Sequence, residues 1–322
     1  MNMIEETNKI PIVAIIGPTA VGKTEASLAL ARNLNAEIIS VDSRQVYRYL
    51  NVGTDKISAS VREEIPHHLI DVVAPDEIFS AADFVSHAQI AIEKIRSSGR
   101  VPLLVGGTAF YYKALEGGFL TESLPKSEAV RASLEREIKD KGLHALHRRL
   151  EALDPVSAKR VHPNDPVRTM RALEIYELTG RTATEWYQEG VKSPSRYKIH
   201  YIGLNLPRET LYVRIAQRVK EQFASGYYEE VRWLLEKGYS PELPAMQGFG
   251  YRELVRYHFG EMTFEEALEG DIRATKIYAR RQITWFKHFL PVTWYDLSKL
   301  SLCDIIPQMT EISFAHLGGM KP

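Results

Sequence analysis

Eight residues near the start of the chain have the types and spacing of a phosphate-binding loop. In order they are Gly17, Pro18, Thr19, Ala20, Val21, Gly22, Lys23 and Thr24. They satisfy the pattern G-x-x-x-x-G-K-[ST] at every constrained position. The glycines let successive backbone N–H groups turn toward one anion, and the N-terminus of a following helix adds partial positive charge. Lys23 would reach the outer phosphate, and the Thr24 hydroxyl would coordinate Mg²⁺. This segment, the phosphate loop below, predicts a phosphate site without saying whose phosphate is bound.

The elements around the phosphate loop come in the order that this chemistry requires. The apolar run 10–16 predicts a buried strand before the loop, and residues 25–34 predict a helix after it. Further apolar runs alternate with helical patterns, which is typical of a parallel sheet with helices on both faces. These strand candidates are residues 37–41, 101–105, 197–204 and 291–295. The predicted fold class is therefore α/β.

Asp42 directly follows the second predicted strand. The carboxyl ends of parallel strands are where α/β sheets bind ligands, so Asp42 is a candidate site residue. It could equally be the N-cap of a helix that begins near Ser43. The spacing leaves both interpretations open.

The third buried strand ends in Gly106, Gly107 and Thr108. Two glycines allow close backbone approach, and the hydroxyl is an uncharged donor at a place where many nucleotide hydrolases have an acidic Mg²⁺ partner. A plain tight turn would also explain the pattern. The segment is thus a second candidate for the site.

Two arginines, Arg214 and Arg218, lie four residues apart on a predicted helix and so share one face. They could form a solvated basic face. Alternatively, they could neutralise the charge on a departing diphosphate, for which planar guanidinium groups are better suited than lysine.

The whole chain is neutral, with 41 Lys plus Arg against 41 Asp plus Glu, so its bulk charge does not indicate nucleic acid. Basic residues do cluster locally, and such clusters would let a protein of zero net charge bind an RNA backbone. Arg168 and Arg171 lie one turn apart, and bases and aromatics alternate along residues 273–287.

The single cysteine, Cys303, excludes an internal disulfide. An acidic start and the lack of a long apolar run favour a cytoplasmic protein without a membrane span.

The chain divides by composition. Residues 1–118 and 196–300 carry the α/β pattern, residues 119–195 are helical throughout, and residues 301–322 predict a C-terminal helix with a frayed tail. We therefore expect an α/β core with an all-helical insertion domain.

Taken together, several motifs resemble those of the tRNA dimethylallyltransferases in order and spacing from about residue 10 to about residue 296. Besides the phosphate loop they are Asp42-Ser43-x-Gln45-Val46-Tyr47, Gly106-Gly107-Thr108, His162-Pro163-Asn164-Asp165, Gly250-Tyr251-Arg252-Glu253 and Arg280-Arg281-Gln282-x-x-Trp285-Phe286. This family transfers a five-carbon isoprenyl group to N6 of adenosine 37 in tRNAs that read codons beginning with U. The resemblance implies a P-loop NTPase-like sheet, a bound Mg²⁺, and a monomer that contacts the anticodon stem-loop.

The resemblance also assigns roles to individual residues. It implies that the phosphate loop and Arg214 hold the diphosphate of dimethylallyl diphosphate, that Asp42 is the general base or anchor for N6, and that Thr108 and Arg218 contact the leaving diphosphate. It implies a role in tRNA binding for Asp42, Ser43, Arg44, Gln45, Arg131, Arg168, Arg171, Gly250, Tyr251, Arg252 and Arg281.

Three other functions remain open from the residues alone. A P-loop phosphotransferase would use ATP and phosphorylate a small acceptor, but it would leave the insertion without a purpose. An adenylate isopentenyltransferase would perform the same chemistry on a free nucleotide. A nucleotide-switched RNA-binding protein would leave Asp42 unexplained.

Overall fold

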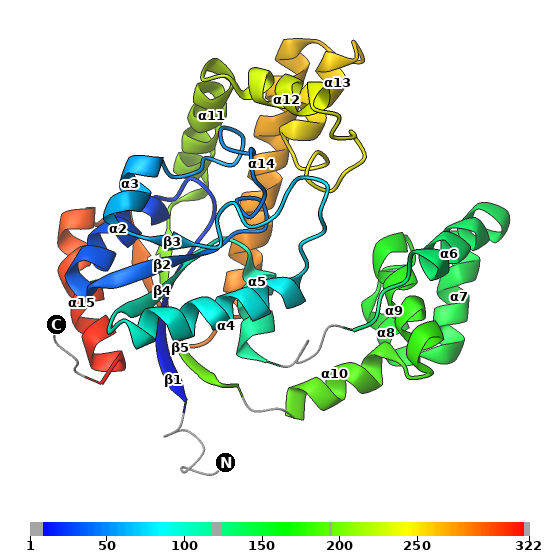
Figure 1. Cartoon of the computed structure of the whole chain (residues 1–322), viewed down its shortest axis with the longest axis horizontal. Helices are drawn as coiled ribbons and strands as arrows, with labels where there is room; N and C mark the ends of the chain where they lie inside the picture. The colour runs from blue at the N-terminus through cyan, green and yellow to red at the C-terminus, as the bar shows by residue number, and fades with distance from the viewer. Residues whose placement is uncertain (1–8, 118–123, 193–194, 319–322) are drawn as a thin grey trace. The chain divides into compact units, whose positions relative to one another are not determined.

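The computed structural model describes residues 9–117, 124–192 and 195–318 (Figure 1). The chain forms two compact units: Met1–Tyr112 with Tyr197–Pro322, and Lys113–Arg196. The expected border at residues 118/119 and the expected tail at 319–322 lie outside the described residues. The C-terminal helix α15 (Leu302–His316) belongs to the first unit.

A six-stranded sheet forms the centre of the first unit, in the order β3-β2-β4-β1-β5-β6 with every pairing parallel. The strands are β1 (Ile10–Ile16), β2 (Ala36–Val41), β3 (His67–His68), β4 (Val101–Gly106), β5 (Tyr197–Asn205) and β6 (Val292–Asp296). Because β2, β4 and β1 are neighbours, the segments that follow them meet at one edge of the sheet.

The two faces of the sheet bury different side chains, because successive residues of a strand point to opposite faces. Val13 and Ile15 of β1 belong to a large apolar cluster with helix α2 (Lys23–Leu34). Tyr201 is the register partner of Ala14 and so faces the other way, where its ring lies 5.1 Å from that of Phe289. The sheet is therefore covered on both faces.

The other helices of the first unit connect the strands or follow β5. They are α3 (Ala59–Glu64), α4 (Ala81–Ser97), α5 (Ala109–Glu116), which runs into the second unit, α11 (Arg208–Ala224), α12 (Tyr227–Glu236), α13 (Tyr251–His258) and α14 (Phe264–Phe286). Figure 1 shows α11 and α14 running close together, and the two helices are in contact. No helix within the described ranges is long and apolar enough to cross a membrane.

The second unit is a helical bundle with its own small core. Its helices are α6 (Glu128–Lys141), α7 (Leu143–Leu153), α8 (Pro155–Arg160), α9 (Pro166–Thr179) and α10 (Ala183–Lys192). Buried leucines fill the core, among them Leu134, Leu146 and Leu173. Side chains of Ser127, Asp154 and Asp165 cap helix N-termini, so the helix ends are specified locally.

The predicted fold class is confirmed, and the differences from the sequence predictions are local. Strand β3 has only two residues, too few to give a pattern. Helix α14 continues through Gly270 without a break. A β-carbon on Gly270 would lie 3.0 Å from the Glu253 side chain of α13. A glycine at this position permits close packing on α13 at a cost of about 1 kcal/mol in helix propensity.

Candidate active site

The phosphate loop connects β1 to α2 and folds over the start of the helix. Gly22 is the N-cap with a φ of 111°, a left-handed conformation that favours glycine. Val21 is fully buried and anchors the loop in the core. Lys23 Nζ donates to the carbonyl oxygens of Gly17 (3.0 Å) and Pro18 (2.7 Å). The ammonium group therefore lies over the loop, within reach of an anion held there.

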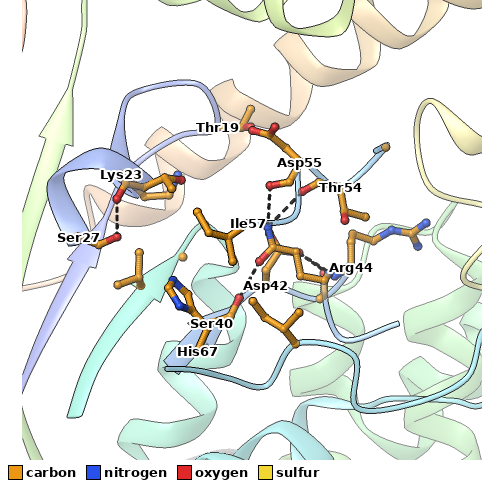
Figure 2. A pocket seen from close by; sticks show the side chains of 18 of the residues that line it. Thr19, Lys23, Ser27, Ser40, Asp42, Arg44, Thr54, Asp55, Ile57 and His67 are labelled. Atoms are coloured by element: carbon orange, nitrogen blue, oxygen red, sulfur yellow. Dashed lines mark hydrogen bonds between the residues drawn. The ribbon is translucent and has the colours of Figure 1, made fainter. Parts of the chain in front are cut away.

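A pocket of about 200 Å³ adjoins the loop (Figure 2). The segments after β1, β2 and β4 all reach it, together with side chains from α11 and α14. The polar groups that line it include Thr19, Lys23, Thr24, Asp42, Ser43, Arg44, Gln45, Thr54, Asp55, Arg218, Tyr278 and Gln282. The phosphate loop, Asp42 and Arg218 thus converge on one cavity, whereas Thr108 and Arg214 are not among its lining residues.

Asp42 lines the pocket and also holds the turn that follows β2. Its Oδ1 accepts the backbone N–H groups of Arg44 (2.7 Å) and Gln45 (3.2 Å). No helix begins near Ser43, so Asp42 is not a helix N-cap; its carboxylate stabilises a local turn instead, and Tyr47 then pairs with Val73. Asp42 therefore combines a structural bond through Oδ1 with a place in the pocket wall.

Thr108 lies next to the pocket but is not among the residues that line it. Its Oγ1 accepts the backbone N–H of Ser43 over 3.2 Å. The phenol of Tyr278 also hydrogen-bonds to Thr108. Burial and the nearby Asp42 raise the pKa of Tyr278 to about 12, so this phenol keeps its proton at neutral pH. Ser43 and Tyr278 thus connect Thr108 to the cavity.

Gln282 joins the phosphate loop to the turn after β4. Its Nε2 donates to the Gly107 carbonyl oxygen (2.9 Å), and its Oε1 accepts the Thr19 backbone N–H (2.9 Å). A β-carbon on Gly107 would lie 2.1 Å from Gln282 Nε2. The glycine therefore makes room for this side chain, whereas the sequence had suggested an approach to a ligand.

Arg218 points into the pocket and pairs with Asp55, with 3.2 Å between Nη1 and Oδ2. Arg214 lies one turn earlier on α11, is exposed and is not among the lining residues. The two arginines therefore differ, and only Arg218 is placed by the structure beside the phosphate loop.

The charges of the pocket act on Lys23. Burial and the Arg218 guanidinium lower the pKa of Lys23 to about 7, while the Asp42 carboxylate opposes the shift. Both neighbours therefore lie close enough to influence the ammonium. A bound anion would favour the charged form, so the site couples anion binding to proton uptake.

Two residues of the segment after Asp42 are engaged with the protein itself. The Arg44 guanidinium donates to the carbonyl oxygens of Pro244 (2.8 Å) and Ala245 and lies over the Tyr251 ring. Gln45 Nε2 donates to the Thr54 carbonyl oxygen over 3.1 Å. Arg44 thus fastens the segment to the loop before α13, which is a structural role besides any contact with RNA.

The predicted tRNA residues of α13 and α14 differ in exposure. Tyr251 is 1 % exposed, and its hydroxyl donates to Glu230 Oε1 (2.6 Å), so it is part of the pocket wall rather than of the outer surface. Gly250 is the N-cap of α13, and Arg252 pairs with Glu253 at 2.5 Å. Arg281 is exposed on α14.

The three arginines predicted in the helical unit also differ. Arg131 and Arg171 pair with Glu174 at 2.9 and 2.6 Å, and that carboxylate is 1 % exposed. Burial acts to raise the pKa of Glu174, but hydrogen bonds, first of all from Arg131, hold it below its usual value. Arg168 is 67 % exposed, with Asp165 3.5 Å away. Arg168 is thus the arginine of this set that is open to a ligand.

The donor set suits a magnesium ion carried by phosphates. The Thr24 hydroxyl lines the pocket and could be one oxygen ligand, and Mg²⁺ usually binds through few protein groups together with substrate phosphates and water. Within residues 9–117, 124–192 and 195–318, no group of three or more His, Cys, Asp or Glu side chains is placed to hold a metal. The residues present therefore fit Mg²⁺ that enters with a diphosphate.

The sequence did not identify several residues of the pocket. Asp55 lies in a segment without a motif, and Tyr278 is one of the aromatics that alternate with bases along residues 273–287. Gln282 stood in a motif but had no assigned contact. The available signal was a polar side chain among apolar residues of a helix: buried polar groups such as Gln282 require hydrogen-bond partners, which indicates a structural contact.

The parallel sheet and the phosphate loop define an enzyme that binds a phosphate or diphosphate at the carboxyl edge of a P-loop-like core. Residues 45–289 match the model of the IPP transferase family. The chain belongs to this family.

Similar proteins and solved structures carry the names of transferases that act on tRNA. The tRNA dimethylallyltransferase of Thermomicrobium roseum is 43 % identical over 289 residues, which cover 90 % of this chain and 87 % of that protein. The tRNA dimethylallyltransferase of Geobacillus kaustophilus is 42 % identical over 287 residues, covering 89 % and 90 %. The crystal structure of a tRNA isopentenylpyrophosphate transferase from Bacillus halodurans matches with a TM-score of 0.72 and 39 % identity, covering 96 % and 97 %. A eukaryotic dimethylallyltransferase acting on tRNA matches with a TM-score of 0.78 and 27 % identity, covering 95 % of this chain and 78 % of that one.

Proposed function

We propose that this protein transfers the dimethylallyl group of dimethylallyl diphosphate to N6 of adenosine 37 in tRNAs that read codons beginning with U. The products are N6-isopentenyladenosine in tRNA and free diphosphate. The observation that carries the proposal is that Lys23, Asp42 and Arg218 line one pocket. Diphosphate binding and proton removal from an amine need cations and a carboxylate side by side. The family of the chain supports the same reaction.

On the donor side, the reaction breaks the bond between C1 of the dimethylallyl group and the diphosphate oxygen. Negative charge then develops on the leaving diphosphate. Lys23, Arg218 and the backbone N–H groups of the phosphate loop would stabilise that charge from fixed positions, which requires little reorganisation during the step. A Mg²⁺ held through the Thr24 hydroxyl would supply further charge stabilisation to the diphosphate.

On the acceptor side, the adenine N6 amine forms the new bond to C1 and loses a proton. Asp42 would accept that proton or hold the amine by a hydrogen bond, a contribution of roughly 10² to 10⁴ in rate. The Tyr278 phenol, held by its hydrogen bond with Thr108, would orient the acceptor as a donor beside the carboxylate. All pocket-lining residues come from the first unit of one chain, so a monomer would suffice.

The target base must leave the stack of the anticodon loop to enter a pocket of this size. Unstacking costs a few kcal/mol, which contacts to the rest of the tRNA must offset. Exposed cations such as Arg168 and Arg281 are suited to such contacts. We infer that the helical unit takes part in holding the anticodon stem-loop.

The proposal can be tested by measuring transfer of label from dimethylallyl diphosphate to unmodified tRNA in the presence of Mg²⁺. We expect label on tRNA that carries adenosine at position 37 and none when that adenosine is replaced. Free AMP as acceptor and labelled ATP as donor should give no product. Label on AMP but not on tRNA would contradict the proposal in favour of a nucleotide prenyltransferase, and a phosphorylated product would favour a phosphotransferase.

A further inference from the structure

A carboxylate outside the pocket holds one of the pocket's loops. Glu230 of α12 is not among the lining residues. Its Oε2 accepts the backbone N–H groups of Asn51 (2.7 Å) and Val52 (2.8 Å). Its Oε1 accepts the N–H of Gly53 (3.2 Å) and the hydroxyl of Tyr251 (2.6 Å). Hydrogen bonds to an ionised acceptor are about twice as strong as neutral ones, so this carboxylate fixes the backbone firmly.

The residues that Glu230 holds continue directly into the pocket, and we call residues 51–55 the 51–55 loop. The Thr54 carbonyl oxygen accepts a hydrogen bond from Gln45 Nε2 (3.1 Å). The next residue, Asp55, pairs with Arg218 over 3.2 Å. One short segment is therefore held by Glu230 at its start and contacts two pocket side chains at its end.

Neighbouring elements leave the 51–55 loop little room to move. Gln222 of α11 donates to the Val52 carbonyl oxygen over 3.0 Å. A β-carbon on Gly53 would lie 2.2 Å from the Tyr227 ring. Asp55 itself has a φ of 52°, a left-handed conformation that non-glycine residues adopt only when their surroundings hold them. The loop is thus set in one position.

The Asp55–Arg218 pair alone is too weak to orient the arginine. The Asp55 side chain is 53 % exposed and that of Arg218 is 31 % exposed. Pairs of such exposure contribute about 1 kcal/mol or less, and an arginine loses much rotamer freedom when it is held. The pair can orient Arg218 only if Asp55 is already fixed, and Glu230 provides that fixation through the backbone.

We propose that Glu230 is a positioning residue for the prenyl-donor site. It fixes the 51–55 loop so that Asp55 holds the Arg218 guanidinium toward the leaving diphosphate. This inference rests on the proposed function, in which Arg218 contacts that diphosphate.

The test compares Glu230→Gln with Glu229→Gln. An amide has one acceptor oxygen and a donor NH₂ group, so in Glu230→Gln at least one N–H of the 51–55 loop faces a donor and loses its hydrogen bond. The volume of the side chain stays nearly the same. We expect kcat/KM for dimethylallyl diphosphate to fall about tenfold, while the dissociation constant for tRNA changes by less than about twofold. Glu229 is exposed on the same helix, and Glu229→Gln should behave as the wild type.

A double-mutant cycle with Asp55→Asn separates positioning from general destabilisation. If Glu230 acts through Asp55, Glu230→Gln should cost less than about twofold in the Asp55→Asn background. A merely structural role would give equal losses in both backgrounds and would overturn the inference. Should Glu230→Gln fail to fold, the same cycle with Glu230→Asp, which keeps the charge, gives the same comparison.

The outcomes also distinguish this inference from the proposed function. If the wild type and Glu229→Gln transfer label to tRNA but the cycle is additive, only the inference about Glu230 is wrong. If neither transfers label, the proposed function is wrong. Calorimetric binding of dimethylallyl diphosphate to the same variants then still measures whether Glu230 acts through Asp55.

Discussion

Gln282 and Gly107 are 175 residues apart in the chain, yet Gln282 Nε2 donates to the Gly107 carbonyl oxygen over 2.9 Å. The Oε1 atom of the same side chain accepts a hydrogen bond from the Thr19 backbone N–H of the phosphate loop. One buried side chain thus links two loops that face the pocket. A substitution that breaks the link to one loop should therefore also displace the other loop.

Gly107→Ala should displace Gln282 and release Thr19, since the new β-carbon would lie 2.1 Å from Nε2. We expect kcat/KM for dimethylallyl diphosphate to fall about tenfold or more in steady-state assays. Gln282→Ala should have a similar effect, and the double variant should be little worse than either, because both changes remove the same link. Fully additive losses would contradict this coupling.

Asp42→Asn separates the two roles of Asp42. The amide oxygen can still accept the N–H groups of Arg44 and Gln45, so the melting temperature should stay within a few degrees of the wild type. The amide cannot take a proton, so turnover should fall about 100-fold or more while tRNA binding remains. A loss of only about twofold in kcat would show that Asp42 merely holds the turn.

Donor affinity should depend on the protonation of Lys23, whose pKa lies at about 7. The charged form binds the diphosphate, so binding is strongest below that pKa and weakens as the pH rises through it. Relative to Lys23→Arg, whose guanidinium stays charged, the wild-type dissociation constant should rise about tenfold between pH 6 and pH 8. Parallel profiles of the two proteins, measured by calorimetry, would argue against this titration.

Asp271 should make stability depend on pH. It is 3 % exposed, and burial raises its pKa to about 7 against a hydrogen bond from Thr275 (3.0 Å). Because the folded state holds this proton more tightly than the unfolded chain, the stabilisation is complete below about pH 4 and is lost as the pH rises through 7. Between pH 5.5 and 8 the free energy of unfolding of the wild type should therefore fall by about 2 kcal/mol relative to Asp271→Asn. Equal pH profiles in denaturant titrations would be inconsistent with a buried, neutral Asp271.

Arg168→Ala and Arg171→Ala should have different effects. Arg168→Ala should leave stability unchanged and reduce the salt dependence of tRNA binding by about one unit of slope, as for one lost phosphate contact. Arg171→Ala removes a partner of the buried Glu174 and should destabilise the helical unit by about 2 kcal/mol. A stable Arg171→Ala protein with a reduced salt slope would instead place Arg171 on the RNA.

The fold and the chemical part of the site could be predicted where the signal is local. Residues 17–24 are contiguous, and the strand before them is a continuous apolar run, so the phosphate loop needed no knowledge of distant contacts. Asp42 and Gly107 followed from their positions after strands, since parallel strands bring their carboxyl ends together.

The rest depended on contacts between distant residues. Arg131 and Arg171 look like free cations in the sequence, and only the burial of Glu174 between them shows that they hold the helical unit together. Asp55 lies in a segment without a motif and reaches Arg218 only because Glu230 holds its loop. Local patterns do not encode such pairings.

The pairing of β1 with β5 has a consequence for synthesis of the chain. β1 has β4 on one side and β5 on the other, with Ile10 opposite Tyr197, so one edge of β1 stays open until the ribosome has passed the whole helical unit. That unit has its own core and can fold first as it emerges. A fragment that stops before β5 would expose an apolar strand edge of the kind that aggregates, whereas Lys113–Arg196 form a compact unit with a hydrophobic core of their own.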